Sequence, residues 1–569
     1  MLARSMLWLT VLQSVAAAQT SPPQPTDIVF LHGAAYTVDA VRSWAEAVAV
    51  HNGRIVYVGP DSGVAAWIGP QTRSVDLQGK MLLPGFHDSH VHLVGGGLEL
   101  GECNINGLTT VQQIQEALGQ FAKDHPEKKW IRGGGWPLTI EGGNPHKALL
   151  DKIVSDRPVM LDAFDGHSKW VNSRALEIAG ITKDTDDPPK GRIERDPQTR
   201  EPTGTLRELA AYLVINKSPP YSHDDYVEGL RRGLVLARRM GITSVQEARA
   251  TAQHLDAFAA LDRAGELTVR AVVAMQADPA KAKAMSEVPQ FVEWRKKYQG
   301  RWLRTTAVKF FQDGVIESRT AALLEPYLGG DGGSGWLNFE PDDFKPLAAE
   351  LDRLGFQIHI HAIGDRAIQS SFDALEFARD RNGSRDSRHH IAHIQLFDPP
   401  DLVRFRKLGV VANFQPLWAY ADPYIVDMTI PILGPERSRW LYPIRSVANT
   451  GAVIACGSDW SVTSMNPLDA IQVAVTRRGL EEGPGPAWLP EEVVDLPTMI
   501  AGYTINGAYV NFEERETGSI EVGKAADLIV LDRNLFEIPA HEIHLAKVLL
   551  TMLDGAEIYR DAEFRAGMP

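Results

Sequence analysis

The sequence has very few cysteines, which excludes one way of stabilising a chain. Cys103 and Cys456 are the only two among 569 residues, and they lie far apart. A framework of disulfides therefore cannot hold this protein together. Cys456 lies in the apolar run "AVIACGSDW" without a basic neighbour, which indicates a small buried core residue and not a nucleophile.

Positive charge and long apolar runs are also scarce. The chain has 58 Lys and Arg against 72 Asp and Glu, a formal net charge of -14, and no basic cluster. We therefore expect no nucleic-acid partner. No apolar run reaches the roughly 20 residues that a membrane-spanning helix needs. Because 44% of the residues are hydrophobic, the chain can still bury a large core, and we expect a globular protein with a second, smaller unit.

Residues 1–18 have the composition of an export signal. Arg4 precedes an apolar stretch that ends at Val15, and the alanines that end at Ala18 have the small-x-small pattern of a cleavage site. We therefore expect an exported protein, periplasmic or secreted, that is cut after Ala18. An uncleaved N-terminal anchor is the alternative.

Two motifs typical of other enzyme classes are missing. No G-x-G-x-x-G run stands at a strand-to-helix turn, which argues against a dinucleotide-binding domain. No G-x-S-x-G elbow is present to support a serine nucleophile.

The middle of the chain alternates strand-like apolar runs with amphipathic helix-like segments, as parallel α/β domains do. The strand-like runs include "GITSVQEA", "RTTAVKFFQDG", "GFQIHIHAIGD", "SRHHIAHIQLF", "LGVVANFQP" and "GAVIACGSDW". Each ends in a polar residue and a loop, which favours a TIM-like (β/α)8 barrel over an open sheet. In such barrels the chemistry lies at the C-terminal ends of the strands. We assign residues 85–511 to this α/β barrel.

Two further units are predicted around the barrel. Short β-branched runs punctuated by Gly and Asp occur in residues 27–84 and again in 512–565, and we expect these two ends to form one small β-sandwich. Residues 102–220 contain loops rich in Gly and Pro. We interpret them as an insertion after the first barrel strand that covers the active site.

The stretch "GFHDSHVHL" predicts half of a metal site. On a strand, residues i and i+2 point to the same face, so His90 and His92 project together, and Asp88 lies one step below. Two converging imidazoles suit a divalent metal, and zinc is the first choice for nitrogen and oxygen donors. A chance surface cluster of histidines is the alternative.

Four more residues raise the odds of a metal site, because each stands in or at the end of an apolar strand: Lys309, His361, His393 and Asp459. A carboxylate or a lysine is costly to bury without a partner. Each has a plain structural explanation taken alone, such as a hydrogen-bonded core histidine, a helix cap or a lysine that reaches the rim. Together with His90 and His92 they place metal-binding side chains at successive strand ends.

At this point the sequence resembles the amidohydrolase superfamily, the metal-dependent (β/α)8 hydrolases. The resemblance rests on "LPGFHDSHVHL", "VKFFQDGVIESRTAALLEPY", "HAIGDRAI", "HHIAHIQL" and "ACGSDWSV" and extends over nearly the whole mature chain. The stretches "DGHSKWVNSRALEIAG" and "GRIERDPQTREPTGTLRE" resemble more specifically the branch that includes N-substituted formamide deformylase.

The resemblance implies a role for each strand-end residue. His90 and His92 would bind one metal ion together with Asp459, and His361 and His393 would bind a second. Lys309 falls where binuclear members carry a carboxylated lysine that bridges the two ions. If Lys309 is unmodified, a mononuclear site is the alternative.

The resemblance also implies the reaction. A metal-activated water would attack an amide-type C–N bond, that of an N-substituted formamide for example, while Asp459 takes the proton of the water and passes it to the leaving amine. Deaminases of the family carry an acid three residues after the fifth-strand histidine, whereas the third residue after His361 is Gly364. Hydrolysis of an amide is therefore preferred to deamination, and deamination, ester or lactone hydrolysis and a non-catalytic exported metal-binding protein remain alternatives.

Four residues outside the metal motifs are our candidates for contacts with a small-molecule substrate: Trp136, His167, Arg319 and Trp418. Core packing is the alternative for the tryptophans, a structural salt bridge for Arg319 and a helix cap for His167. Aromatic residues in the pocket would suit an apolar N-substituent. No cationic cluster lies beside the metal motifs, so we do not predict a highly anionic substrate. The sequence leaves the oligomeric state open, including a homo-oligomer.

Overall fold

The computed structural model describes residues 26–330 and 332–564. The export signal expected over residues 1–18 lies outside these ranges. Among the described residues, no helix combines the length and the apolar character needed to cross a membrane.

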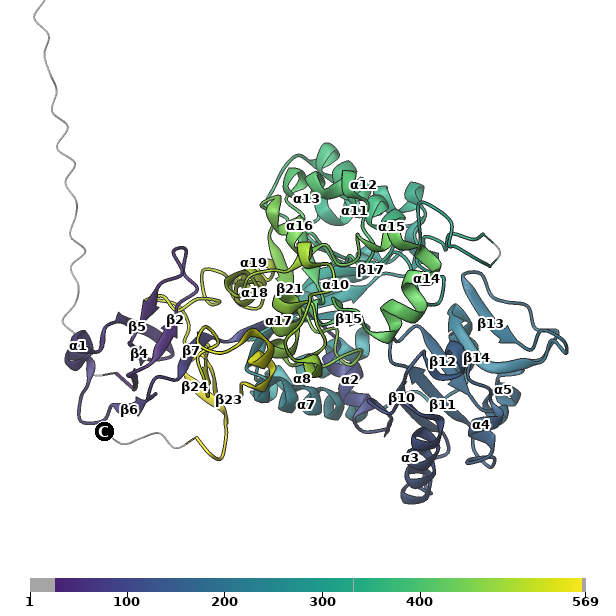
Figure 1. Ribbon diagram of the computed structural model, residues 1–569, viewed down its shortest axis with the longest axis horizontal. Coiled ribbons are helices and arrows are strands. Elements are labelled where there is room, and N and C mark those ends of the chain that lie inside the picture. The colour runs from purple at the N-terminus through teal and green to yellow at the C-terminus, as the bar shows by residue number, and fades with distance from the viewer. Residues whose placement is uncertain (1–25, 331, 565–569) are drawn as a thin grey trace, which may run out of the picture.

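Eight parallel strands form the barrel at the centre of the molecule (Figure 1). In chain order they are β8 (Phe86–Val91), β15 (Ile242–Ala250), β16 (Arg270–Gln276), β17 (Leu303–Phe311), β18 (Gln357–Ala362), β19 (His390–His393), β20 (Val411–Phe414) and β21 (Ile454–Cys456). Backbone hydrogen bonds draw the first and last strands together, because Asp459 donates to His90 O at 2.8 Å and His92 donates to Trp460 O at 2.9 Å. The predicted TIM-like barrel is confirmed. The strand β16 was missed, since it is an apolar run without a metal-binding residue.

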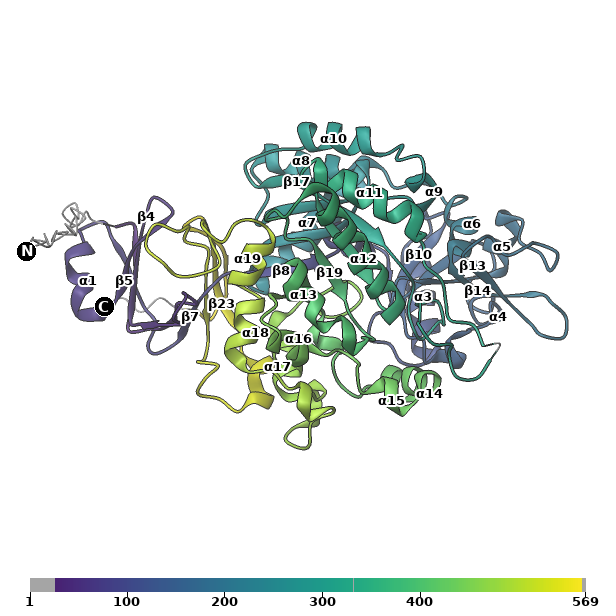
Figure 2. The same ribbon diagram turned by 90° about the horizontal axis from the view of Figure 1, so that it is seen from above.

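Helices surround the barrel on the outside (Figure 2). The longest are α7 (His223–Arg239), α8 (Ala252–Ala264), α11 (Pro341–Arg353) and α12 (Asp365–Asn382). Ser222 begins α7 with a capping box, because its hydroxyl accepts from Asp225 N and the Asp225 carboxylate accepts from Ser222 N.

The helix α2 (Leu93–Glu99) follows His92 directly and packs very closely against α7. A Cβ atom on Gly97 would lie 1.8 Å from the carbonyl oxygen of Gly229, so only glycine fits at Gly97. On its other side the Glu247 carboxylate of β15 accepts a hydrogen bond from Val94 N. These contacts fix the backbone immediately after the first metal motif.

Both ends of the chain form one β-sandwich, as expected. One sheet has the order β5-β4-β1-β6 and the other β24-β23-β22-β7-β2-β3. Their bounds are β1 (Ile28–Leu31), β2 (Ala34–Tyr36), β3 (Trp44–Ala45), β4 (Ala47–His51), β5 (Arg54–Gly59), β6 (Arg73–Asp76), β7 (Met81–Pro84), β22 (Leu528–Leu531), β23 (Val548–Leu553) and β24 (Ala556–Arg560). Phe30 and Val50 from the first sheet share a buried core with Leu82 and Val530 from the second.

A second β unit stands at the opposite end of the molecule from the sandwich (Figures 1 and 2). It lies between β8 and β15 and contains a six-stranded sheet of order β13-β14-β12-β11-β10-β9. The strands are β9 (Cys103–Asn104), β10 (Ile131–Trp136), β11 (Val159–Ala163), β12 (Ser168–Val171), β13 (Gly191–Arg195) and β14 (Pro202–Glu208), with α3 (Val111–Asp124) and α5 (Ser173–Ala179) packed beside them. We call this unit the insertion.

Candidate metal centre

His90, His92 and Asp459 meet where β8 and β21 end. The Nε2 atom of His90 lies 3.2 Å from Asp459 Oδ1, and the Nε2 atom of His92 lies 3.0 Å from the same oxygen. Both imidazoles therefore face one carboxylate, as the spacing of the H-x-H motif predicts.

The spacing between these two strands is fixed from below by Asp88. Its carboxylate accepts hydrogen bonds from the backbone N–H groups of His90 on β8 and of Ser458 just after β21, at 3.2 and 3.0 Å. Burial raises the pKa of Asp88 to about 7. Asp88 thus links the backbone that carries His90 to the backbone that carries Asp459.

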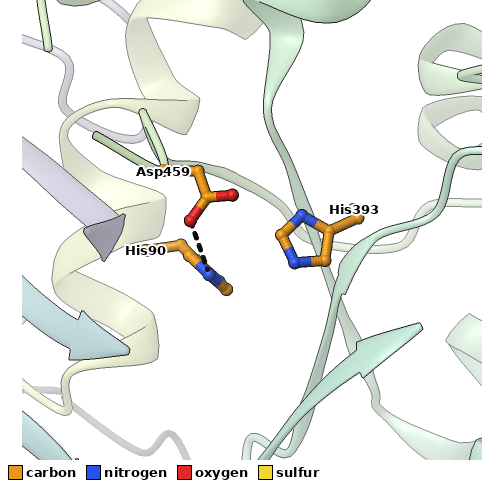
Figure 3. A group of neighbouring side chains, drawn as sticks. All are labelled: His90, His393 and Asp459. Carbon is orange, nitrogen blue, oxygen red and sulfur yellow. Dashed lines mark ion pairs between the residues drawn. The ribbon is translucent and has the colours of Figure 1, made fainter. Parts of the chain in front are cut away.

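His393, the last residue of β19, completes a group that could hold a metal ion (Figure 3). One ligand atom each from His90, His393 and Asp459 all lie within 4.8 Å of one another, and all three residues are buried. The Nδ1 atom of His393 has no hydrogen-bond partner in the described part of the chain, and the Oδ1 atom of Asp459 faces only the His90 and His92 imidazoles. Buried polar atoms normally have partners, so these atoms fit a cation held among them.

The protonation of the cluster also suits a metal ion. Burial lowers the pKa of His90 to about 3 and lowers the pKa values of His92, His361 and His393 as well, so the imidazoles are neutral and can act as ligands. Burial opposes the ionisation of Asp459, but the imidazoles of His90 and His92 hold its pKa well below the ordinary value.

Lys309 lies fully buried on β17, directly beside His90. Its Nζ atom is 3.2 Å from His90 Nε2, and no carboxylate of the described residues comes within 4.0 Å of it. Burial lowers the pKa of Lys309 to about 7. The structure therefore places a readily neutralised amine at the centre of the cluster.

His361, on β18, packs against His393 with 4.5 Å between the ring centroids. Its Nε2 atom faces the loop after β17, at 3.2 Å from Gly314 O and 3.5 Å from Asp313 Oδ1. Sequence reasoning missed Asp313, a buried carboxylate that accepts from the backbone of Ile363 and Gly364 and so holds the end of β18. Its signal was a carboxylate just beyond the apolar strand in "KFFQDG".

The insertion reaches this site through His167 and Glu208. The Nδ1 atom of His167 lies 3.1 Å from both carboxylate oxygens of Glu208, which also accepts from Thr320 Oγ1 at 2.8 Å. The His167 ring is 5.4 Å from that of His361. Burial opposes the charged form, yet the Glu208 carboxylate raises the pKa of His167 to about 9. Glu208 was also missed, because only the antiparallel pairing of β12 with β14 shows that it neighbours His167.

The other three candidates for substrate contacts lie in different environments. Trp418 stacks on His393 with ring centroids 5.4 Å apart and an interplanar angle of 7°, so it lines the site. Trp136 is fully buried in the core of the insertion, where its Nε1 atom donates to Leu161 O and its ring packs against Trp170. Arg319 donates to Gly329 O and Leu328 O, and so it holds its own loop. In the structure Trp136 thus has packing contacts and Arg319 has loop contacts.

Comparisons with known proteins agree with this geometry. A model of the amidohydrolase family matches residues 73–559. The chain is 32% identical to the protein LONG AFTER FAR-RED 3 of Arabidopsis thaliana, over 94% of this chain and 91% of that protein. It is 29% identical to the N-substituted formamide deformylase of Arthrobacter pascens, over 94% and 99%. An uncharacterized metal-dependent hydrolase from Pyrococcus horikoshii has the same fold, with a TM-score of 0.70 at 24% identity over 90% of this chain and 99% of that one.

Proposed function

The chain belongs to the amidohydrolase family of metal-dependent hydrolases, and from this membership we propose that it uses water to cleave an amide-type carbon–nitrogen bond. N-substituted formamides are among the candidate substrates, because a relative of nearly equal length is named as a deformylase of such compounds. The observation that carries the proposal is the Asp459 carboxylate, which faces neutral imidazoles at the mouth of the barrel.

The donors of the cluster fit zinc, which accepts imidazole nitrogen and carboxylate oxygen. His90, His92 and Asp459 would hold one ion, and His361 and His393 would hold a second. When bound, such an ion lowers the pKa of a coordinated water from about 16 to roughly 7 and polarises a carbonyl oxygen.

Lys309 would bridge two ions as a carbamate. Its uncharged amine can add to the carbon of CO2, which forms an N–C bond and releases one proton. The product is an anionic oxygen ligand, whereas the ammonium form would repel a cation. The burial of Lys309 and its lowered pKa support this modification.

Two side chains handle protons during the proposed hydrolysis. The Asp459 carboxylate accepts a proton from the attacking water and delivers it to the amine nitrogen as the C–N bond breaks. His167, oriented by Glu208, donates through Nε2–H to the carbonyl oxygen as negative charge develops there. Trp418, stacked on His393, provides an apolar wall for the substituent.

Deamination of a ring fits the site less well. The residue three positions after His361 is Gly364, and Asp365 follows as the first residue of α12. The Asp365 carboxylate accepts from Leu324 N at 2.8 Å and from Arg366 N at 2.9 Å, and so it is engaged in holding the helix start. Esters and lactones would use the same groups as amides and stay as alternative substrates.

We also propose that residues 1–18 direct export, since their pattern is that of a cleaved signal. The mass of the protein recovered from the culture medium or periplasm tests this, with loss of residues 1–18 as the expected result. Recovery of the uncut chain in the cytoplasm would contradict it.

A substrate screen with metal analysis tests the function. The zinc-loaded protein is incubated with N-formyl, N-acyl and cyclic amides and with esters and lactones. Asp459→Asn is tested in the same way, and Asp427→Asn, at an exposed side chain, is the control. We expect amide hydrolysis that is lost in Asp459→Asn and kept in the control. Full metal occupancy without turnover of any compound would favour a metal-binding protein instead.

A further inference from the structure

Arg249 is a charged residue at the barrel mouth that the proposed mechanism does not use. It is the penultimate residue of β15, at the same end of the barrel as the metal centre, and it is exposed within an otherwise buried strand. Its position directly after the run "GITSVQEA" makes it another polar strand end.

Neutral groups hold the Arg249 side chain in place. Its Nε atom donates to Gln276 Oε1 at 3.0 Å, and its Nη2 atom donates to Tyr212 Oη of the insertion at 3.2 Å. The guanidinium carbon lies 6.0 Å from the centre of the Phe311 ring. The guanidinium is therefore oriented by three partners that leave its charge uncompensated.

Other arginines around the insertion have carboxylate partners. Arg132 pairs with Glu102 at 2.9 Å, and Arg207 pairs with Glu194 at 3.1 Å. Within the described ranges, no carboxylate comes within 4.0 Å of Arg249, and its Nη1 atom has no hydrogen-bond acceptor. Nη1 and the second N–H of Nη2 are thus free for a planar anion.

The guanidinium is connected to the metal centre through Phe311. The same ring lies 4.7 Å from Lys309 Nζ and 5.4 Å from the His361 ring. Gln276, which holds Arg249, is also the register partner of Lys309 across β16 and β17. Arg249 therefore faces the same space as the metal-binding side chains.

A guanidinium with free N–H groups on Nη1 and Nη2 suits a carboxylate, which accepts charge-assisted hydrogen bonds on its oxygens. A single arginine suits one negative charge, in keeping with the absence of a cationic cluster in the metal motifs. Phe311 and Trp418 add apolar surface on the two sides of the centre. The site therefore offers contacts for one carboxylate and one apolar group beside the scissile bond.

We propose that Arg249 determines specificity by binding a carboxylate of the substrate, so that the preferred substrates are N-formyl or N-acyl amino acids with an apolar side chain. This inference rests on the proposed amide hydrolysis and narrows it to a substrate class.

Paired substrates that differ by one carboxylate test it. N-formylphenylalanine is compared with N-formylphenethylamine on the zinc-loaded protein, on Arg249→Gln and on Arg249→Lys, with Arg239→Gln at an exposed helix end as the control. We expect the parent to prefer the acid by about 10- to 100-fold in kcat/KM, the range for hydrogen bonds to charged groups. Arg249→Gln should remove this preference through KM, Arg249→Lys should keep part of it, and the control should keep all of it.

Equal rates on the acid and the neutral amide in the parent would overturn the proposal, as would an equal loss on both in Arg249→Gln. If no amide is hydrolysed, the proposed function is wrong. The role of Arg249 is then tested by the affinity of the protein for the two formamides. Titration calorimetry of both formamides into Asp459→Asn, with and without Arg249→Gln, measures it. Tighter binding of N-formylphenylalanine than of N-formylphenethylamine, lost when Arg249→Gln is added, supports the proposal. Equal binding of the two compounds overturns it.

Discussion

The two ends of the barrel treat charged side chains in opposite ways. At the lower end, where the strands begin, Arg270 bonds to Asp527 of the sandwich with 2.6 and 3.2 Å between the paired atoms. At the upper end, where the strands finish, His393 keeps a buried nitrogen without a partner, Asp459 faces imidazoles only, and Arg249 has no counter-ion among the described residues.

Within the same strands, we therefore expect the lower ends to contribute to stability and the upper ends to contribute to catalysis. Paired groups at the lower end contribute to holding the sandwich on the barrel, so their loss costs folding free energy. Groups at the upper end keep bonding capacity that the proposed metal ion and substrate would use, at some cost in stability. Substitutions at the upper end should therefore lower turnover, and substitutions at the lower end should lower stability.

The largest expected effect is at the upper end. Asp459→Asn removes the proton acceptor without changing the shape of the side chain, so we expect kcat/KM to fall by about 10²- to 10⁴-fold. The melting temperature of the chelator-treated protein should change little, since an amide of the same shape can still contact the His90 and His92 imidazoles. Steady-state kinetics and thermal unfolding measure the two quantities. A large loss of stability with unchanged turnover would refute the separation.

Arg270→Met should act in the opposite way. It leaves the fully buried Asp527 carboxylate without its partner, and breaking a buried pair costs about 3–5 kcal/mol of the free energy of unfolding. The turnover per folded molecule should remain that of the parent. Denaturant unfolding measures the stability, and rates divided by the concentration of folded protein measure the turnover. Arg301→Met, at an exposed side chain, is the control. Loss of turnover in fully folded Arg270→Met would argue against the comparison.

Lys309→Met tests both stability and turnover at the centre of the barrel. The change replaces a buried amine by an apolar side chain of similar length, so the metal-free protein should be as stable as the parent or more stable. Turnover should fall by about 10²-fold, because the bridging ligand is lost and charge stabilisation by an ion is worth several kcal/mol. Metal content should fall from two ions to one. Retention of two ions per chain would rule out the carbamate bridge.

The smallest expected effect is a pH dependence at the lower end. Asp352 on α11 accepts from His389 Nε2 at 2.9 Å and pairs with Arg385. Although burial opposes it, the hydrogen bonds from His389 and Arg385 hold the pKa of Asp352 well below its ordinary value. Because the folded pKa lies below the unfolded value of about 3.9, the stabilisation is complete above that pH and is lost as the pH falls toward the folded pKa.

Asp352→Asn should therefore flatten the acid limb of the stability curve. Urea unfolding between neutral and strongly acidic pH measures this limb, and the variant and the parent should converge at the acid end. Parallel curves over the whole range would show that Asp352 does not titrate between the two states.

Residue types at strand ends were readable from the sequence, because the alternation of a strand places His90 with His92 and because a buried strand makes a polar residue conspicuous. Arg249 was not singled out from the sequence, because a polar residue directly after "GITSVQEA" is equally typical of a solvated strand end. Trp136 and Trp418 both stand in or near loops. Only the meeting of distant segments decides that the first packs in a core and the second against His393.

Contacts between segments far apart in sequence also limited what could be predicted at other positions. Glu208 lies 41 residues from His167 in sequence, and no local pattern links them before β12 and β14 pair. The strand β16 was invisible to a search guided by metal-binding residues, although its apolar run is a good strand. Sequence patterns thus predicted the side chains that meet at the strand ends better than the residues that orient them.

The pairing of β7 with β22 imposes an order on biogenesis. Because β7 leads directly into the H-x-H strand, the support beneath His90 and His92 is incomplete until residues 528–531 have been synthesised. A nascent chain that lacks β22 would expose that edge and position the two imidazoles poorly, so metal loading is expected to follow the synthesis of β22.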